Sequence, residues 1–264
     1  MDHDTPVLVL TGASRGLGRG IALAAARRGA HLVLNARSEV RLQAVARQAE
    51  ACGVRALVVP GDIGRPATAQ RLLQAAHETF GRIDAVIHNA GVLPPLAPVA
   101  QADLEAWEAN WRVNFFGAVA LARYALPHLR PRRGRLILIS SGAAVHPYPT
   151  WGAYCTAKAA LNHLAAVLAA EEPEVTTLAF RPGVVDTDMQ TYIREQGRQV
   201  MPPDLYQRFV AYKAQGRLHP PEEVGTVVAL LALEAPAAWS GQFIAFYAEP
   251  VRSWLRERGI LLPS

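Results

Sequence analysis

The sequence predicts an α/β fold in which seven parallel strands form a doubly wound sheet within a single domain. Short apolar runs alternate with longer helical patterns along nearly the whole chain of 264 residues. The short runs are continuously hydrophobic, which indicates strands buried on both faces, as in a parallel sheet. The first of them leads directly into a glycine-rich turn and a helical pattern, as expected for the first unit of such a sheet.

The elements follow from this alternation. Seven apolar runs are expected to be strands, at residues 7–12, 31–36, 55–61, 83–91, 134–141, 175–183 and 241–247. Segments rich in Ala, Arg and Leu are expected to be helices, at residues 16–29, 38–51, 66–80, 102–126, 151–171 and 221–234. No linker, repeat or low-complexity tract divides the chain, so residues 1–264 are expected to form one domain.

One segment departs from the alternation. Residues 184–219 separate the sixth strand from the last helix and contain a Pro-Pro pair at 202–203 together with several polar residues. A connection of that length is usually either functional or disordered.

Composition and charge exclude several classes of protein. The chain is 51% hydrophobic and 19% charged, which suits a well-buried core and argues against disorder. The net charge of +5 comes from scattered Arg residues, and the densest basic cluster, at 130–135, contains Pro and Gly and is interpreted as a solvated turn rather than a nucleic-acid surface. Cys52 and Cys155 match no metal-ligand or disulfide pattern.

The beginning of the chain and its apolar runs bear on where the protein acts. The first ten residues, MDHDTPVLVL, lack a basic segment followed by a long apolar run, so they are interpreted as leading into a strand rather than as a signal peptide. No uncharged apolar run reaches membrane-spanning length. A soluble, cytoplasmic protein without membrane, nucleic-acid or metal ligands is expected.

The glycine-rich turn at 11–18, TGASRGLG, predicts a dinucleotide site. Gly12 permits a tight turn, while Gly16 and Gly18 allow close backbone approach and leave the N-terminus of the following helix open to a phosphate. The spacing differs from G-x-G-x-x-G, because three residues separate the first two glycines, and an ordinary tight turn is the alternative interpretation. Ser14, Arg15 and Leu17 of the same turn are expected to bind the cofactor as well.

The end of the second strand indicates which dinucleotide binds. NAD sites place an acidic residue about 20 residues beyond the loop to bind the ribose hydroxyl groups. Here Ala36 stands at that position and Arg37 follows it. A carboxylate would repel a 2′-phosphate, whereas Arg can pair with one. Together with Arg15 in the loop, this pattern favours NADPH over NADH.

Tyr154 and Lys158 are four residues apart, one helical turn, so their side chains are expected to share a helix face. A cation beside a phenol favours the phenolate and lowers a pKa that is normally about 10. The pair is therefore a candidate acid/base group. The alternative is a chance spacing of a half-buried ring and a solvated amine.

A wider set of motifs gives this pair its context. The chain contains, in order, TGASRGLG, Asp62 in GDI, HNAG at 88–91, Asn114 in RVNFFG, ISS ending at Ser141, YCTAK at 154–158 and RPGVV at 181–185. In this order the motifs resemble the short-chain dehydrogenase/reductase family over essentially the whole chain. The resemblance implies a single-domain Rossmann-type fold and a catalytic set of Asn114, Ser141, Tyr154 and Lys158.

The resemblance also implies roles for these residues. Tyr154 would donate a proton to the substrate carbonyl, and Ser141 would hydrogen-bond its oxygen. Lys158 would lower the phenol pKa and bind the nicotinamide ribose, and Asn114 would hold a water that relays protons. The implied cofactor contacts are Asp62 at the adenine edge, Asn89, Ala90 and Gly91 at the ribose, and Ile63, Pro182, Gly183, Val185, Thr187 and Met189. His88 departs from the family, which commonly has Asn there.

The run RPGVVDTDMQTYIRE at 181–195 resembles the sepiapterin reductase and benzil reductase-like group of this family. In that group the segment passes over the nicotinamide and opens the substrate lid, which implies a lid at about 184–219. Sepiapterin reductase anchors the pterin through an Asp in the last strand, where this chain has Ala245. Glu249 is the residue that could replace it. The loss of a charge-assisted acceptor disfavours a pterin.

The expected substrate pocket is aromatic and apolar. It comprises Ser141, Tyr154, Tyr192 and the segment HPYPTW ending at Trp151, with Met201 beside them. The leading hypothesis is an NADPH-dependent carbonyl reductase, acting on CH–OH/C=O groups of small apolar ketones or vicinal diketones. A pterin reductase and a dinucleotide-binding sensor without turnover are the alternatives.

Two features stay open. The resemblance implies a homodimer or homotetramer formed through the helix at 102–126 and the helix that carries Tyr154. The tail at 250–264 is either a loose terminus or a segment that docks Trp254 and Leu255 on the body.

Overall fold

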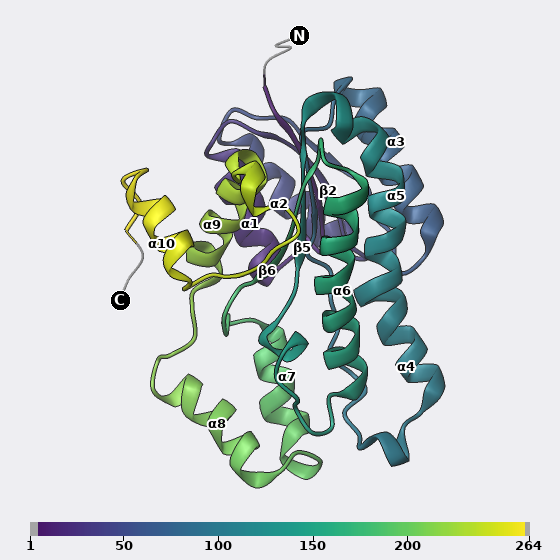
Figure 1. Ribbon diagram of the computed structural model, residues 1–264, viewed down its shortest axis with the longest axis vertical. Helices are drawn as coiled ribbons and strands as arrows, with labels where there is room; N and C mark the ends of the chain where they lie inside the picture. The colour runs from purple at the N-terminus through teal and green to yellow at the C-terminus, as the bar shows by residue number, and fades with distance from the viewer. Residues whose placement is uncertain (1–4, 262–264) are drawn as a thin grey trace.

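A computed structural model gives the structure of residues 5–261. A single parallel sheet in the strand order β3-β2-β1-β4-β5-β6-β7 forms its centre (Figure 1). The strands are β1 (Val7–Thr11), β2 (His31–Asn35), β3 (Ala56–Val58), β4 (Ala85–His88), β5 (Arg135–Ile139), β6 (Thr176–Arg181) and β7 (Phe243–Ala245). The order of the strands reverses between β1 and β4, because β2 and β3 are added on one side of β1 and β4 to β7 on the other. Ligands bind outside the carboxyl ends of strands at such a switch point.

Helices cover both faces of the sheet, which confirms the predicted doubly wound fold (Figure 1). One face carries α1 (Gly16–Ala26), α2 (Glu39–Glu50) and α9 (Pro221–Glu234), and the other carries α3 (Pro66–Phe80), α5 (Gly117–Leu129) and α6 (Gly152–Glu171). Each strand contributes apolar side chains to both hydrophobic layers, one between the sheet and each set of helices. Leu8 and Leu10 of β1 pack in the layer with α1 and α9, while Val7 and Val9 pack in the layer with α3 and α5.

The helix expected at 102–126 is two helices joined by a π-turn. The segment comprises α4 (Leu104–Trp111), the π-turn Arg112–Phe116 and α5. The side chain of Asp103 caps α4 by accepting hydrogen bonds from the backbone N–H groups of Glu105 and Ala106. Such π-bulges occur frequently at functional sites, and this one carries Asn114.

The long connection at 184–219 is ordered and mostly helical. It contains α7 (Asp188–Gln196) and α8 (Pro203–Ala214), which extend beyond the carboxyl ends of the strands (Figure 1). Lys213 forms an ion pair with Asp186 at 2.6 Å, and a parallel bridge joins Val185 to His219. These contacts hold the two ends of the segment together below the sheet.

The tail docks on the body through α10 (Glu249–Arg256), which settles the open alternative for the described part of the tail. Val251, Trp254 and Leu255 are buried in the layer that contains α1 and α9. The Arg258 guanidinium lies 4.2 Å from the centre of the Trp254 indole and pairs with Glu234 of α9 at 3.1 Å. Residues 262–264 lie outside the described part of the chain.

Candidate active site

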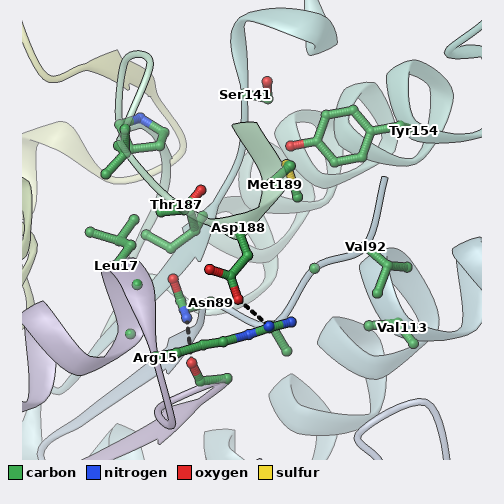
Figure 2. Close-up of a pocket in the computed structure, with 18 of the residues that line it drawn as sticks. Arg15, Leu17, Asn89, Val92, Val113, Ser141, Tyr154, Thr187, Asp188 and Met189 are labelled. Carbon is green, nitrogen blue, oxygen red and sulfur yellow. Dashed lines mark hydrogen bonds and ion pairs between the residues drawn. The ribbon is translucent and has the colours of Figure 1, made fainter. Parts of the chain in front are cut away.

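A cavity of about 540 Å³ lies at the carboxyl ends of β1, β4, β5 and β6 and is partly covered by α7 and α8. It contains most of the residues that the sequence singled out. Those that line it are Gly12, Ser14, Arg15, Gly16, Leu17, Gly18, Arg37, Asp62, Ile63, Asn89, Ala90, Gly91, Ser141, Trp151, Tyr154, Lys158, Pro182, Gly183, Val185, Thr187 and Met189. Asn114 and Tyr192 do not line it. Figure 2 shows Tyr154 and Ser141 at one end of this cavity and Arg15 at the other.

The glycine loop forms the end of the cavity next to α1. A Cβ atom on Gly18 would lie 2.0 Å from the Gly12 carbonyl oxygen, and one on Gly12 would lie 2.9 Å from the Cα of Ala90. Gly12 also has φ of +66°, which side chains disfavour. The first turn of α1 has no side-chain cap among the described residues, so its backbone N–H groups are open toward the cavity. This arrangement fits the pyrophosphate of a dinucleotide.

A hydrogen-bond cluster joins the ends of β1 and β4 beneath that loop. The Thr11 hydroxyl accepts hydrogen bonds from the backbone N–H groups of Asn89 and Ala90, both at 3.1 Å. The Asn89 amide donates to the carbonyl oxygens of Thr11 and Gly12 at 3.1 and 3.2 Å. The loop and the start of the Asn-Ala-Gly segment are therefore held as one unit.

Three arginines line the cavity at the end expected to bind the dinucleotide, and their contacts differ. Arg37 and Arg41 line the cavity beside Ala36 and are exposed. Arg15, which the sequence suggested as a partner for a 2′-phosphate, forms an ion pair with Asp188 at the start of α7 (Figure 2). Neither Arg41 nor Asp188 was predicted from the sequence. Arg41 lies in the first turn of α2, four residues beyond Arg37, and its closeness to Arg37 in the sequence could have identified it.

Tyr154 and Lys158 lie on one face of α6, as their spacing predicted, and both side chains are buried. The Lys158 Nζ lies 5.6 Å from the centre of the Tyr154 ring and donates a hydrogen bond of 2.8 Å to the Ile139 carbonyl oxygen. Tyr154 packs edge-on against Trp151, with ring centres 6.2 Å apart.

The expected lowering of the phenol pKa does not occur. Burial raises the pKa of Tyr154 to about 12, although a hydrogen bond with Ser141 opposes the rise. Burial also lowers the pKa of Lys158 to about 7, so near neutral pH the amine readily loses the charge that was expected to favour a phenolate. The physical reason is that desolvation penalises both ionised forms, the phenolate of Tyr154 and the ammonium of Lys158.

Asn114 is buried behind the residues that line the cavity. Its amide nitrogen donates to the Val92 carbonyl oxygen at 2.8 Å and to the Asn110 side-chain oxygen at 2.8 Å, and its oxygen accepts from the Val92 N–H at 3.2 Å. A Cβ on Gly91 would lie 3.0 Å from the Asn114 side-chain oxygen and 3.5 Å from the Lys158 Nζ. The π-turn thus brings Asn114, Gly91 and Lys158 together.

His88 is buried beneath this group. Its Nδ1 lies 3.4 Å from the Thr11 hydroxyl oxygen. The same hydroxyl donates a hydrogen bond of 3.5 Å to the Ile87 carbonyl oxygen. Burial lowers the pKa of His88 to about 3, with the nearby charge of Lys158 acting in the same direction. The residue is a neutral part of the floor of the site.

An aromatic wall lines the cavity beside Tyr154. The rings of Tyr148 and Trp151 are stacked with centres 4.8 Å apart, and Phe209 of α8 lies 5.2 Å from Trp151. Phe209 was not identified from the sequence because it comes from the long connection. Tyr192 and Met201 pack in the hydrophobic cluster that supports this wall, so they are placed behind the cavity lining rather than in it.

The comparisons with known proteins agree with this geometry. Residues 6–198 match the short chain dehydrogenase family. An uncharacterized oxidoreductase of Schizosaccharomyces pombe is 37% identical over 90% of this chain and 95% of its own length. The benzil reductase ((S)-benzoin forming) of Saccharomyces cerevisiae is 35% identical over 92% of this chain and 96% of its own length.

Solved structures give the same result. The crystal structure of the KRED1-Pglu enzyme has a TM-score of 0.87 and 42% identity, covering 91% of this chain and all of that one. The YIR035C short chain dehydrogenase/reductase of Saccharomyces cerevisiae has a TM-score of 0.89 and 36% identity, covering 94% and 98%. No helix within residues 5–261 is both long and apolar enough to cross a membrane. The chain belongs to the short-chain dehydrogenase/reductase family and is an oxidoreductase that uses a nicotinamide dinucleotide and acts on a small molecule.

Proposed function

We propose that the protein is an NADPH-dependent carbonyl reductase that acts on small apolar ketones or vicinal diketones. The observation that carries this proposal is the position of the Tyr154 and Ser141 side chains, which line one cavity together with the aromatic wall of Tyr148, Trp151 and Phe209. Aromatic rings beside the hydroxyl groups favour an apolar, flat substrate whose carbonyl oxygen reaches both hydroxyls. The printed activity of the yeast relative, a benzil reductase, supports the same substrate class.

NADPH supplies the hydride in this reaction. The Tyr154 phenol, with its pKa at about 12, stays protonated at neutral pH and donates its proton to the carbonyl oxygen. Ser141 orients that oxygen by a hydrogen bond. Lys158, with its pKa at about 7, can exchange protons near neutral pH, and its Nζ lies 5.6 Å from the centre of the Tyr154 ring, so it is the group assigned to return a proton to Tyr154.

The preference for NADPH is inferred from charge. Ala36 stands where an acidic residue would repel a 2′-phosphate, and the exposed guanidinium groups of Arg37 and Arg41 line the same end of the cavity. A phosphate at this position would have two positively charged partners.

Two observations support a substrate other than a pterin. Ala245 lies at the end of β7, where an acid would be needed, and Glu249 is exposed, pairs with Arg256 and does not line the cavity.

The sensor alternative predicts dinucleotide binding without turnover. An assay that follows the near-ultraviolet absorbance of NADPH distinguishes the three hypotheses. It compares benzil, 1-phenyl-1,2-propanedione and sepiapterin as substrates, with NADH as the control cofactor. Turnover of the diketones with little of sepiapterin supports the proposal, and rapid sepiapterin reduction overturns it.

We also propose a homo-oligomeric protein that works in the cytoplasm and has residues 184–219 as its substrate lid. Trp107, Trp111 and Phe116 line a shallow hollow on α4 and the π-turn, and Phe116 is 53% exposed. A second copy of the chain would cover this hollow. Light scattering of the wild type and of Phe116→Glu measures the mass in solution, and a monomeric wild type would contradict the assembly.

A further inference from the structure

Arg181, the last residue of β6, brings a positive charge into the catalytic end of the cavity. A Cβ atom on Gly142 would lie 2.8 Å from its Nη2 and 3.0 Å from its Nε. The guanidinium therefore occupies the space that a side chain at 142 would take. Because Gly142 directly follows Ser141, this cation lies one residue away from the catalytic hydroxyl.

Within residues 5–261, this cation has no ion pair with an acidic side chain. Within residues 5–261, Arg181 takes part in none of the ion pairs, and the contact the structure gives its guanidinium is the ring of Tyr247, whose centre is 5.2 Å away. The side chain is half-buried. A half-buried guanidinium without a counter-ion is a strong site for an anion, because it has lost part of its hydration and still presents several donors.

The neighbouring strand explains why no acid is present. Arg181 is directly opposite Ala245 in the parallel register of β6 and β7. Ala245 is the position at which an acidic anchor would stand for a pterin. The chain therefore has a positive charge on β6 and no negative charge opposite it on β7, which makes this end of the pocket attractive to anions and unfavourable to basic groups.

The position of Arg181 argues against a role in binding the dinucleotide phosphates. Arg15 of the glycine loop lies at the other end of the cavity from Ser141 and Tyr154 (Figure 2). Arg37 and Arg41 follow β2, which is separated from β5 and β6 by β1 and β4. Arg181 instead lies beside Gly142, next to the group that receives the carbonyl.

We propose that Arg181 is a specificity-determining residue that binds a carboxylate of the substrate, so that the preferred substrates are oxo acids with an aromatic or apolar tail. This inference rests on the carbonyl reductase function proposed above. The tail lies against Tyr148, Trp151 and Phe209, and the carboxylate forms a charge-assisted pair with Arg181. The carbonyl carbon gains a hydride from NADPH and its oxygen gains the Tyr154 proton, which yields the hydroxy acid and NADP⁺.

The test compares acids with their own esters. The first pair is benzoylformate and its methyl ester, and the second pair is 3-benzoylpropionate and its methyl ester. Within each pair the charge differs and the phenyl ketone is kept. The two pairs differ in the distance between carbonyl and carboxylate. In the wild type, kcat/KM for at least one acid is expected to exceed that of its ester. In Arg181→Met the ratio of acid to ester is expected to fall about 10- to 100-fold, since a hydrogen bond to a charged group contributes about 1.5–3 kcal/mol.

Three further variants control this result. Arg181→Lys keeps the charge and should restore part of the ratio. Ala245→Asp places a carboxylate opposite Arg181 and should lower the ratio without removing the arginine. Arg208→Met removes an exposed cation of α8 that lies 5.5 Å from the Tyr148 ring but does not line the cavity, and it should leave the ratio unchanged.

The outcomes separate this inference from the proposed function. Reduction of benzil and the esters, with acids no better than esters in the wild type, overturns the inference and leaves the proposed function standing. An equal loss on acid and ester in Arg181→Met, or a raised KM for NADPH, also overturns it, because the residue would then act on folding or on the cofactor. Absence of turnover with every carbonyl compound overturns both.

Discussion

The guanidinium of Arg15 and the carboxylate of Asp188 form an ion pair that joins the glycine loop to the first turn of α7 (Figure 2). The two residues are 173 positions apart in the chain, and both side chains are more than half exposed. The pair lies at the dinucleotide end of the cavity, where Arg15 was expected to meet a phosphate. We therefore expect the carboxylate and a cofactor phosphate to compete for the same cation.

This competition predicts the effect of removing the carboxylate. Asp188→Asn should lower the dissociation constant of NADPH a few-fold, because Arg15 is released and a negative charge is removed from the cavity. Exposed ion pairs contribute about 0–1 kcal/mol, so the effect should be modest and should shrink at high salt. Fluorescence titration of NADPH at low and high ionic strength measures it. Glu222→Gln, which breaks the exposed Arg19 pair outside the cavity lining, is the matched control. Weaker binding in Asp188→Asn would contradict the competition.

Removing the phenol should abolish most of the activity. Tyr154→Phe keeps the ring that packs against Trp151 but loses the proton donor, so kcat should fall about 10²- to 10⁴-fold. The dissociation constant of NADPH and the melting temperature are expected to stay close to those of the wild type. Stopped-flow and steady-state rates with a diketone substrate provide the measurement. Near-normal turnover would show that another group donates the proton.

The buried Lys158 predicts how stability depends on pH. Its pKa is about 7 in the folded protein, compared with 10.5 in the unfolded chain, so between these values the unfolded chain binds the extra proton. The free energy of unfolding contributed by this group therefore rises as pH increases from about 7 to about 10 and is lost as pH falls through 7. Tyr154 acts in the opposite direction above pH 10, because its pKa is raised to about 12.

Urea unfolding at several pH values between 7 and 10 tests this linkage. The difference in unfolding free energy between the wild type and Lys158→Met should change in favour of the wild type as pH rises. Two curves that run parallel over this range would mean that Lys158 keeps an ordinary pKa when the protein folds.

The arginines beside Ala36 predict cofactor selectivity. Arg37→Ala and Arg41→Ala should each reduce the ratio of kcat/KM for NADPH over NADH by about tenfold, since each removes a charged partner of the 2′-phosphate. The double variant should lose more than either single variant. Steady-state rates with the two cofactors measure the ratio. An unchanged ratio in the double variant would assign the 2′-phosphate to another group, with Arg15 as the first candidate.

Local patterns were sufficient to predict much of this protein. Continuous hydrophobicity located all seven strands, although their ends extended up to three residues too far, because a run of apolar residues continues past the last paired residue. The glycine spacing at 11–18 located the dinucleotide end. The four-residue spacing of Tyr154 and Lys158 placed both side chains on one face of α6. Each of these features depends on neighbours within a few residues, so the sequence itself carries it.

Contacts between distant residues determined the rest. The sequence predicted a lowered phenol pKa, but the pKa values of Tyr154 and Lys158 depend on burial by the whole fold, which reverses the expectation for Tyr154. The pairing of Arg15 with Asp188, and the place of Arg181 beside Gly142, require segments that meet only when the sheet is assembled. The sequence by itself therefore determined the fold and the family, and it predicted the reacting groups. Only the tertiary structure decided their charges and partners, because desolvation and long-range pairing depend on what surrounds a side chain in space.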